Sequence, residues 1–183
     1  PSYVKRQLKE ESLRETRGKP GWRTSGDYGM DWGSAVHSLM ETMMRRPEAN
    51  LVTLAARACV HYELEQSRAD ELVELVQQVR QSSLWQRAMR SECCYVEVPV
   101  DAVESNDVLV MHRGVIDLLF KQEDGWVIVD YKTDDLSEDN LATAVRRYRP
   151  QIESYAKYWE QISDEFVVER GLYFTRVDSY QRV

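Results

Sequence analysis

Three charged side chains lie in two apolar segments whose other residues are suited to burial. Asp117 lies in the apolar run 115–120, and Asp130 and Lys132 lie in the run 126–133. An unpaired charge inside a folded protein is costly, so each of these groups needs a compensating partner. Two carboxylates and an ammonium at the ends of adjacent strands suggest a divalent cation held beside a reacting group.

The two apolar runs are predicted to form one β-hairpin. Both are rich in β-branched residues, and the polar sequence Lys-Gln-Glu-Asp-Gly separates them. Valine alternates with other residues just before the hairpin, and this period of two indicates a further strand. Strands are therefore expected at about 93–100, 109–120 and 126–133. Glu97 lies in the first of these, either as a third acid near the cation or as a polar residue on an open sheet face.

Residues 31 to 90 have the periodicity of helices. The first helix is predicted to end near Pro47, and similar stripes predict two more helices and a short helical piece near residue 85. These helices would form a layer beside the strands, and His61 within them is expected to be structural or exposed. The first helix carries four apolar residues at the i, i+3, i+4, i+7 spacing, Val36, Leu39, Met40 and Met43.

Three polar groups on predicted helices have simpler structural interpretations. His37 lies beside the apolar stripe, where a lone histidine is more often hydrogen-bonded in the core than a ligand. Gln151 and Tyr155 form an i, i+4 pair on a helix expected over 141–162, and a packed tyrosine with a solvated glutamine is the simpler interpretation. Pro150 should kink this helix or begin a new one, because proline cannot donate to the preceding turn.

The order of elements predicts an α/β fold. A last strand, expected over 170–177, would return beside the hairpin after the crossover helix. The 183 residues fit one domain, which we place at 29–183. Residues 1–28 are polar and are interpreted as an arm or linker, and DNA contact by this segment is the weaker alternative.

Composition limits the partners and the compartment. The formal net charge is -7, so the whole surface is not that of a polyanion binder, and any nucleic-acid contact must be local, metal-assisted or supplied by a neighbouring domain or subunit. Cys59, Cys93 and Cys94 contain no C-x-x-C pair, and the adjacent pair is poorly placed for a disulfide, which favours a reducing cytoplasm. No apolar run approaches the ~20 residues of a membrane span, so no membrane partner is expected.

Together these segments resemble the PD-(D/E)XK nuclease superfamily, and within it the RecB-like nuclease domain at the C-terminus of AddA and RecB helicase-nucleases. A lone D-x-K is a weak signal, but the ordered set of five elements, with GVID and DYKT on consecutive strands and Q-x-x-x-Y on the next helix, is specific. Ile116 stands where many members have proline, and Asp130 where many have glutamate; both occur in the RecB-like branch. The matching elements are Gly33–His37, the strand with Glu97, Gly114–Asp117, Asp130–Thr133, and Tyr148–Gln151 with Tyr155.

The resemblance implies a fold and a metal site. The fold would be a central mixed β-sheet of the restriction-endonuclease-like core, flanked by helices and carrying an N-terminal helical layer. His37, Asp117 and Asp130 would be metal ligands, with the carbonyl of Tyr131 as a further oxygen. Such a set suits Mg²⁺, and the imidazole makes Mn²⁺ acceptable as well. The three cysteines have the wrong number and spacing for the iron–sulfur cluster of some relatives, so none is expected.

The resemblance also implies catalytic roles. Asp117 and Asp130 would act through the metal, and Lys132 would lie beside the attacking water or the scissile phosphate. Gln151 and Tyr155 would contact the phosphate backbone or support Lys132. Whether Lys132 is a general base stays open, because an ordinary ammonium is protonated at neutral pH.

The implied activity is that of a Mg²⁺- or Mn²⁺-dependent deoxyribonuclease, sequence-independent and exonucleolytic. It would be the C-terminal domain of an ATP-dependent helicase-nuclease that acts in double-strand break repair and recombination. The expected partners are single-stranded DNA, helicase domains of the same longer chain and a second subunit. Two alternatives are a noncatalytic nuclease-fold scaffold that binds DNA or a helicase subunit, and a stand-alone exonuclease of the phage or plasmid recombination type.

Overall fold

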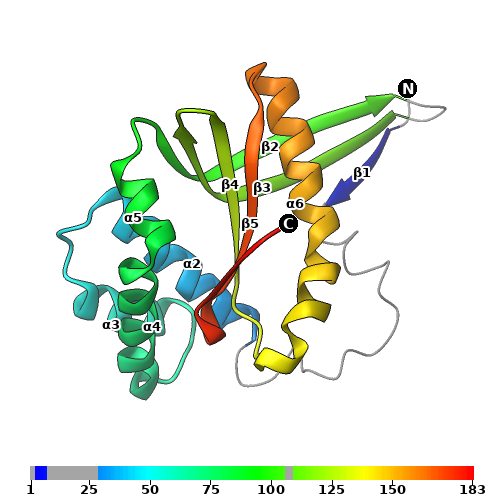
Figure 1. Ribbon diagram of the computed structural model, residues 1–183. Helices are drawn as coiled ribbons and strands as arrows, with labels where there is room; N and C mark the ends of the chain where they lie inside the picture. Colours follow the sequence, from blue (N-terminus) through cyan, green and yellow to red (C-terminus); the bar gives the residue numbers. More distant parts are fainter. Residues whose placement is uncertain (1–2, 8–28, 106–108) are drawn as a thin grey trace.

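A six-stranded mixed sheet forms the centre of the protein (Figure 1). The computed structural model describes residues 3–7, 29–105 and 109–183, without the side chains of 3–7 and 103–112. The predicted α/β fold class, with a mixed sheet flanked by helices, is confirmed. Most of the predicted arm over 1–28 lies outside the described residues, so that interpretation stays a prediction.

The longest strand, β3 (Leu109–Gln122), organises one half of the sheet. Strand β2 (Cys94–Ser105) pairs antiparallel along one side of it. On the other side, β1 (Tyr3–Gln7) pairs parallel with its beginning and β4 (Gly125–Lys132) pairs antiparallel with its end. Strand β1 lies within the segment interpreted as an arm, and the sequence did not predict it.

A helical crossover connects β4 to the other half of the sheet, which contains β5 (Val167–Phe174) and β6 (Ser179–Arg182). After β4 the chain passes through helix α6 and returns beside the hairpin, as predicted, in the form of β5, which pairs parallel with β4. Strand β6 then pairs antiparallel with β5. The sequence did not predict β6, because its four polar residues carry no apolar pattern.

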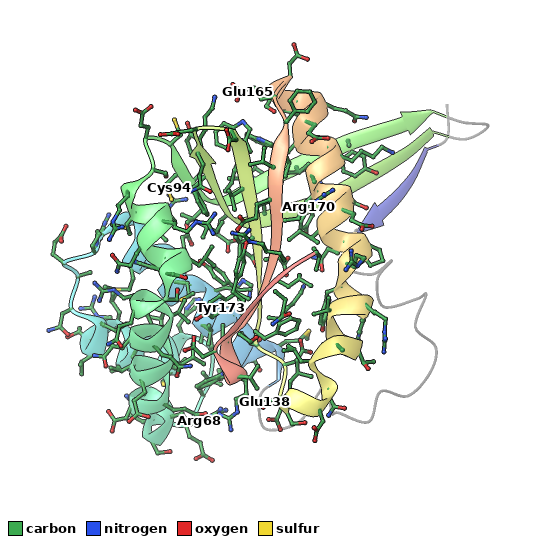
Figure 2. All side chains as sticks on the ribbon, in the orientation of Figure 1. Arg68, Cys94, Glu138, Glu165, Arg170 and Tyr173 are labelled. Carbon is green, nitrogen blue, oxygen red and sulfur yellow. The ribbon has the colours of Figure 1, made fainter. Side chains whose placement is uncertain are left out.

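Helices cover both faces of the sheet (Figure 1). Leu118 and Phe120 of β3 pack against the N-terminal helical layer, whereas Leu119 between them packs against α6. This alternation follows from the opposite directions of successive strand side chains. Figure 2 shows Tyr173 of β5 between the sheet and the helical layer. The helices are α2 (Met30–Arg45), α3 (Leu51–His61), α4 (Ala69–Gln81), α5 (Ser83–Arg90) and α6 (Leu141–Ser163).

The apolar stripe and the capping residue predicted for the first two helices are present in the structure. The predicted apolar stripe of α2 is buried, and the side chain of Asn50 accepts a hydrogen bond from the Thr53 backbone N–H at 2.9 Å, which caps α3. His61 is exposed at the end of α3. Among the described residues, no helix combines the length and the apolar character that crossing a bilayer needs.

Helix α6 departs from the prediction at Pro150. The helix runs unbroken through this proline, so the expectation of a new helix there is wrong. The lost backbone donor removes one hydrogen bond, but the face of α6 that includes Tyr148, Ile152 and Tyr155 is buried against the sheet. Packing of this face outweighs the local preference of one residue.

The residue after the hairpin turn is a glycine for a steric reason. Strands β3 and β4 meet at the pair Gln122 and Gly125, which leaves two residues in the turn. Gly125 has a φ of 144°, and a Cβ there would lie 2.6 Å from the carbonyl oxygen of Phe166. Only glycine combines this backbone conformation with so close an approach.

Candidate active site

The predicted site residues come together from four elements. Helix α2 supplies His37, β3 supplies Asp117, β4 supplies Asp130 and Lys132, and α6 supplies Gln151. Pairwise contacts link His37 to Asp117, Asp130 to Lys132, and Lys132 to Gln151. These two sets are neighbours, because Lys132 acts on the charge of Asp117 and Asp117 on that of Asp130. Residues separated by more than a hundred positions thus form one cluster between the helical layer and α6.

A gap in the strand pairing creates space for this cluster. The ladder between β3 and β4 reaches Leu118 and Val129 and goes no further toward the site. Beyond it, the side chain of Asp117 accepts a hydrogen bond at Oδ2 from the backbone N–H of Tyr131, at 2.7 Å. The carboxylate therefore satisfies a backbone donor outside the regular ladder, and its other oxygen faces His37.

One side of the cluster contains a histidine and two acids. His37 Nδ1 lies 3.3 Å from Asp117 Oδ1 and 4.0 Å from Glu97 Oε1. One ligand atom from each of the three residues lies within 4.8 Å of the other two. Ligands about 2.1 Å from a Mg²⁺ ion are separated by about 3 to 4 Å, so this spacing fits a cation.

Glu97 reaches this position through an irregular backbone. Its neighbours Val96 and Val98 pair with Leu118 and Ile116, but Glu97 itself interrupts the pairing opposite Asp117. Its φ is 53°, a left-handed conformation that costs a non-glycine residue roughly 1–2 kcal/mol. The sequence left two interpretations of Glu97 open, and the structure places it beside His37 and Asp117.

Asp117 is buried and ionised. Burial raises the pKa of this carboxyl, but His37, Lys132 and the Tyr131 backbone N–H together outweigh that effect and lower the pKa. The carboxylate is thereby kept in the form that can bind a cation.

The pKa of Asp130 shifts in the opposite direction from that of Asp117. Its side chain is buried, Oδ1 accepts a hydrogen bond from Gln151 Nε2 at 3.2 Å, and Oδ2 lies 2.5 Å from Lys132 Nζ. The ammonium is close to Oδ2 but not aligned as a hydrogen-bond donor, and no other donor reaches this oxygen within the described part of the chain. Burial raises the pKa of Asp130; Lys132 opposes the rise, and Asp117 adds to it. A bound cation would relieve this unfavourable balance, which is a second sign that the site suits a metal.

Gln151 connects the site to helix α6. Its Oε1 accepts a hydrogen bond from Lys132 Nζ at 2.9 Å, and its Nε2 donates to Asp130 and to the hydroxyl of Tyr155, at 2.9 Å for the latter. The simpler interpretation of a solvated glutamine is therefore wrong, since the side chain is buried and bonded at both ends. Burial raises the pKa of Tyr155, so the phenol stays neutral.

Two glycines of the matching motifs allow close packing at the site. A Cβ at Gly114 would lie 2.5 Å from Cε1 of Tyr155, and a Cβ at Gly33 would lie 3.0 Å from Oγ1 of Thr133. Sequence reasoning placed both glycines in the motifs without giving them a role. Each lies where an element approaches the site too closely for a side chain.

Sequence reasoning also left two polar residues of the site without a role. Tyr148 lies with its ring beside Lys132, and its hydroxyl donates to Asp134, which follows β4. The only signal was the place of Tyr148 three residues before Gln151, on the same helix face. Nothing in the acidic loop after β4 distinguished Asp134 from its neighbours.

Comparison with known proteins agrees with this geometry. A family model for the PD-(D/E)XK nuclease superfamily matches residues 10–181. An ATP-dependent helicase/nuclease subunit from Carboxydothermus hydrogenoformans is 36% identical over 110 residues, which cover 55% of this chain and 9% of the relative. Proteins of the same name from Lachnoclostridium phytofermentans and Clostridium novyi are 44% and 30% identical, over 37% and 52% of this chain and 5% and 8% of their own lengths. The chain thus spans less than a tenth of each of these relatives.

Proposed function

Because the chain belongs to the PD-(D/E)XK nuclease superfamily, we propose that it is a Mg²⁺- or Mn²⁺-dependent deoxyribonuclease that hydrolyses phosphodiester bonds. The observation that carries the proposal is the cluster in which His37, Glu97 and Asp117 face one another beside the Asp130–Lys132 pair. A nuclease fold kept only as a scaffold would have no need of the buried charges of Asp117, Asp130 and Lys132, which are costly to hold inside a protein.

His37, Asp117 and Asp130 would hold the cation, with the Tyr131 carbonyl as a further oxygen. A divalent cation supplies Lewis acidity and lowers the pKa of a water, which makes water a competent nucleophile toward a phosphodiester. Lys132 would hold its positive charge beside the scissile phosphate, where negative charge develops. Gln151 accepts from Lys132 and donates to Asp130, so it would fix the orientation of both.

Tyr155 and the mode of digestion are the remaining parts of the proposal. Tyr155 would support the Gln151 amide, with which it shares a hydrogen bond. None of these groups needs to reach a base edge, so cleavage would be independent of sequence. We also propose exonucleolytic digestion of single-stranded DNA, as the family resemblance implies.

Glu97 extends the ligand set that the family resemblance implies. One of its carboxylate oxygens lies within 4.8 Å of a ligand atom of His37 and of Asp117. Its left-handed backbone conformation interrupts the strand pairing and therefore does not stabilise the sheet. We propose that Glu97 contributes a further oxygen to the cation. Glu97→Gln should weaken Mn²⁺ binding about 10- to 100-fold, measured by calorimetry; unchanged affinity would remove Glu97 from the site.

The relatives suggest a larger context. Their names describe them as subunits of an ATP-dependent helicase/nuclease, so we propose that this domain works at the C-terminal end of such a chain in double-strand break repair and recombination. Helicase domains and a second subunit would bring the strand to the site. A domain with a net charge of -7 should hold DNA weakly by itself, because phosphate binding is dominated by cations, and its activity alone should be feeble.

The test is a nuclease assay with the metal controlled. The purified domain is incubated with end-labelled single-stranded DNA and Mn²⁺ or Mg²⁺, alone and with EDTA. Cleavage should require the metal and fall more than about 100-fold in Asp117→Asn. Asp101→Asn is the matched control, since Asp101 is an exposed acid on β2 paired with Arg113, and it should retain activity.

Calorimetry separates the nuclease from a scaffold. Wild-type protein should bind Mn²⁺, and Asp117→Asn and Asp130→Asn should lose that binding whereas Asp101→Asn keeps it. A protein that binds DNA but shows neither metal binding nor cleavage would be the scaffold. Activity that survives Asp117→Asn or Lys132→Ala would remove the site proposed here.

A further inference from the structure

An aromatic ring lies against the lysine of the site. Lys132 Nζ lies 4.0 Å from the centroid of the Tyr148 ring, and the Lys132 residue is only 5% exposed. Among the described residues, the ammonium contacts the Asp130 carboxylate, the Gln151 amide oxygen and the face of Tyr148. A cation this close to a ring is attracted by the negative charge of the π face, most strongly where water is excluded.

Tyr148 is itself held in a fixed orientation. Its hydroxyl donates to the Asp134 carboxylate, with oxygen distances of 2.9 and 2.8 Å, and its ring packs against Phe174 with centroids 6.5 Å apart. Asp134 comes two residues after Lys132, so this hydrogen bond ties α6 to the segment that follows β4. A phenol that donates to a carboxylate has a more electron-rich ring, which strengthens its attraction for a cation.

We propose that Tyr148 is a positioning residue for Lys132. Its ring would hold the ammonium between Asp130 and Gln151, so that the charge is already in place when a phosphate arrives. The proposal rests on the proposed nuclease function and deepens it. A ring that only filled the core would need neither a cation at its face nor an acid at its hydroxyl.

The first experiment changes the charge of the ring in steps, with Tyr148→Phe, which lacks the hydrogen bond to Asp134, as the reference for the series. Tyr148→Phe keeps the ring, and 4-fluoro-, 3,5-difluoro- and 3,4,5-trifluorophenylalanine at position 148 then reduce the negative charge of its face in steps. The value of kcat for Mn²⁺-dependent cleavage of single-stranded DNA should fall stepwise, by about 2- to 30-fold over the series. KM and Mn²⁺ affinity should stay constant, because Tyr148 would act only through Lys132. A flat kcat series would overturn the proposal.

The second experiment does not depend on activity. A double-mutant cycle of Lys132→Met and Tyr148→Leu, followed by chemical denaturation, measures whether the two side chains interact. The unfolding equilibrium constants should show a coupling of about 2- to 30-fold, and purely additive effects would overturn the proposal. The pair Lys157 and Tyr158 is the matched control, since the ammonium is 5.5 Å from the ring on an exposed lysine, and its coupling should be smaller.

The two readouts separate this inference from the function on which it rests. An inactive wild-type protein with a coupled cycle would refute the nuclease and leave the contact between Lys132 and Tyr148 standing. An active wild-type protein with a flat fluorination series would refute the positioning role and leave the nuclease standing.

Discussion

Two adjacent strands of the sheet each hold a carboxylate with little exposure to solvent, and the two carboxylates differ in their hydrogen-bond and ion-pair partners. On β5, Glu169 accepts hydrogen bonds from Arg87 at 2.9 and 3.0 Å and from the Tyr180 hydroxyl at 2.5 Å. Arg182 adds an ion pair at 2.9 Å. Both carboxylate oxygens of Glu169 therefore have aligned donors or cationic partners.

Asp130 on β4 has fewer partners, namely the Gln151 amide at one oxygen and the Lys132 ammonium at the other. One of its oxygens has no aligned donor among the described residues, and a second carboxylate, Asp117, acts on it unfavourably. The pKa values of the two acids shift in opposite directions. Burial raises the pKa of Glu169, but Arg87 and Tyr180 outweigh this and lower it, whereas the pKa of Asp130 is raised.

On the proposed function, this difference separates a charge that serves stability from one that serves catalysis. The Glu169 cluster is complete within the protein. In the Asp130 cluster two acids share one lysine, so an additional positive charge would make it more favourable, which is the property expected of a cation site. Four predictions test this contrast, in order of decreasing effect.

Asp130→Asn should have the largest effect on activity. The amide cannot hold a divalent cation as a carboxylate does, so we expect Mn²⁺-dependent cleavage to fall more than about 100-fold. Glu169→Gln should change kcat less than about 2-fold in the same assay. Equal losses in the two variants would mean that the two clusters do not differ in role.

Divalent cations should stabilise the protein through the site. At a Mg²⁺ concentration 100 times the Kd, binding to the native state adds about 2.7 kcal/mol to the free energy of unfolding. Thermal melting with and without Mg²⁺ should show this increase in wild type and in Glu169→Gln. Asp117→Asn should melt at the same temperature in both conditions, and an increase there would place the cation elsewhere.

Glu169→Gln should lower stability in a pH-dependent way. At pH 7 the loss of the charge-assisted hydrogen bonds should cost about 1–3 kcal/mol. The folded pKa of Glu169 lies below its ordinary value of 4.5, so its contribution is present above pH 4.5 and is lost as the pH falls through the folded pKa. Urea denaturation of wild type and variant should therefore converge in acid, and a constant difference down to pH 2 would contradict this account.

Arg182→Ala should have the smallest effect. The Arg182 side chain is 68% exposed although it pairs with Glu169, and exposed ion pairs contribute less than about 1 kcal/mol. Denaturation at low and high salt should show a small difference that salt removes. A loss as large as that of Glu169→Gln would mean that the exposed partner carries the cluster.

Much of the fold could be predicted because its signals are local. The alternation in the hairpin and the apolar stripe of α2 predicted elements that the structure contains. Strands β1 and β6 were missed because backbone pairing with β3 and β5, and not their own side chains, defines them. The alternative of a new helix at Pro150 was wrong because the buried face of α6 stabilises a helix that continues through the proline.

The residues of the candidate site could be named from the sequence, but their contacts could not. The motifs named His37, Asp117, Asp130 and Lys132, and the structure places His37 beside Asp117 and Asp130 beside Lys132. The position of Glu97 depends on an interruption of the pairing between β2 and β3. No sequence pattern predicted this interruption.

The sequence by itself determined which residues carry charge inside apolar segments, and hence which side chains could hold a cation beside a lysine. Only the tertiary structure decided which atoms face one another, namely Glu97 with His37, Gln151 with Lys132, and the ring of Tyr148 under the same ammonium. The reason is physical. Burial and residue type follow from local composition, whereas a contact between strands and helices depends on register, backbone irregularity and packing, which involve distant parts of the chain.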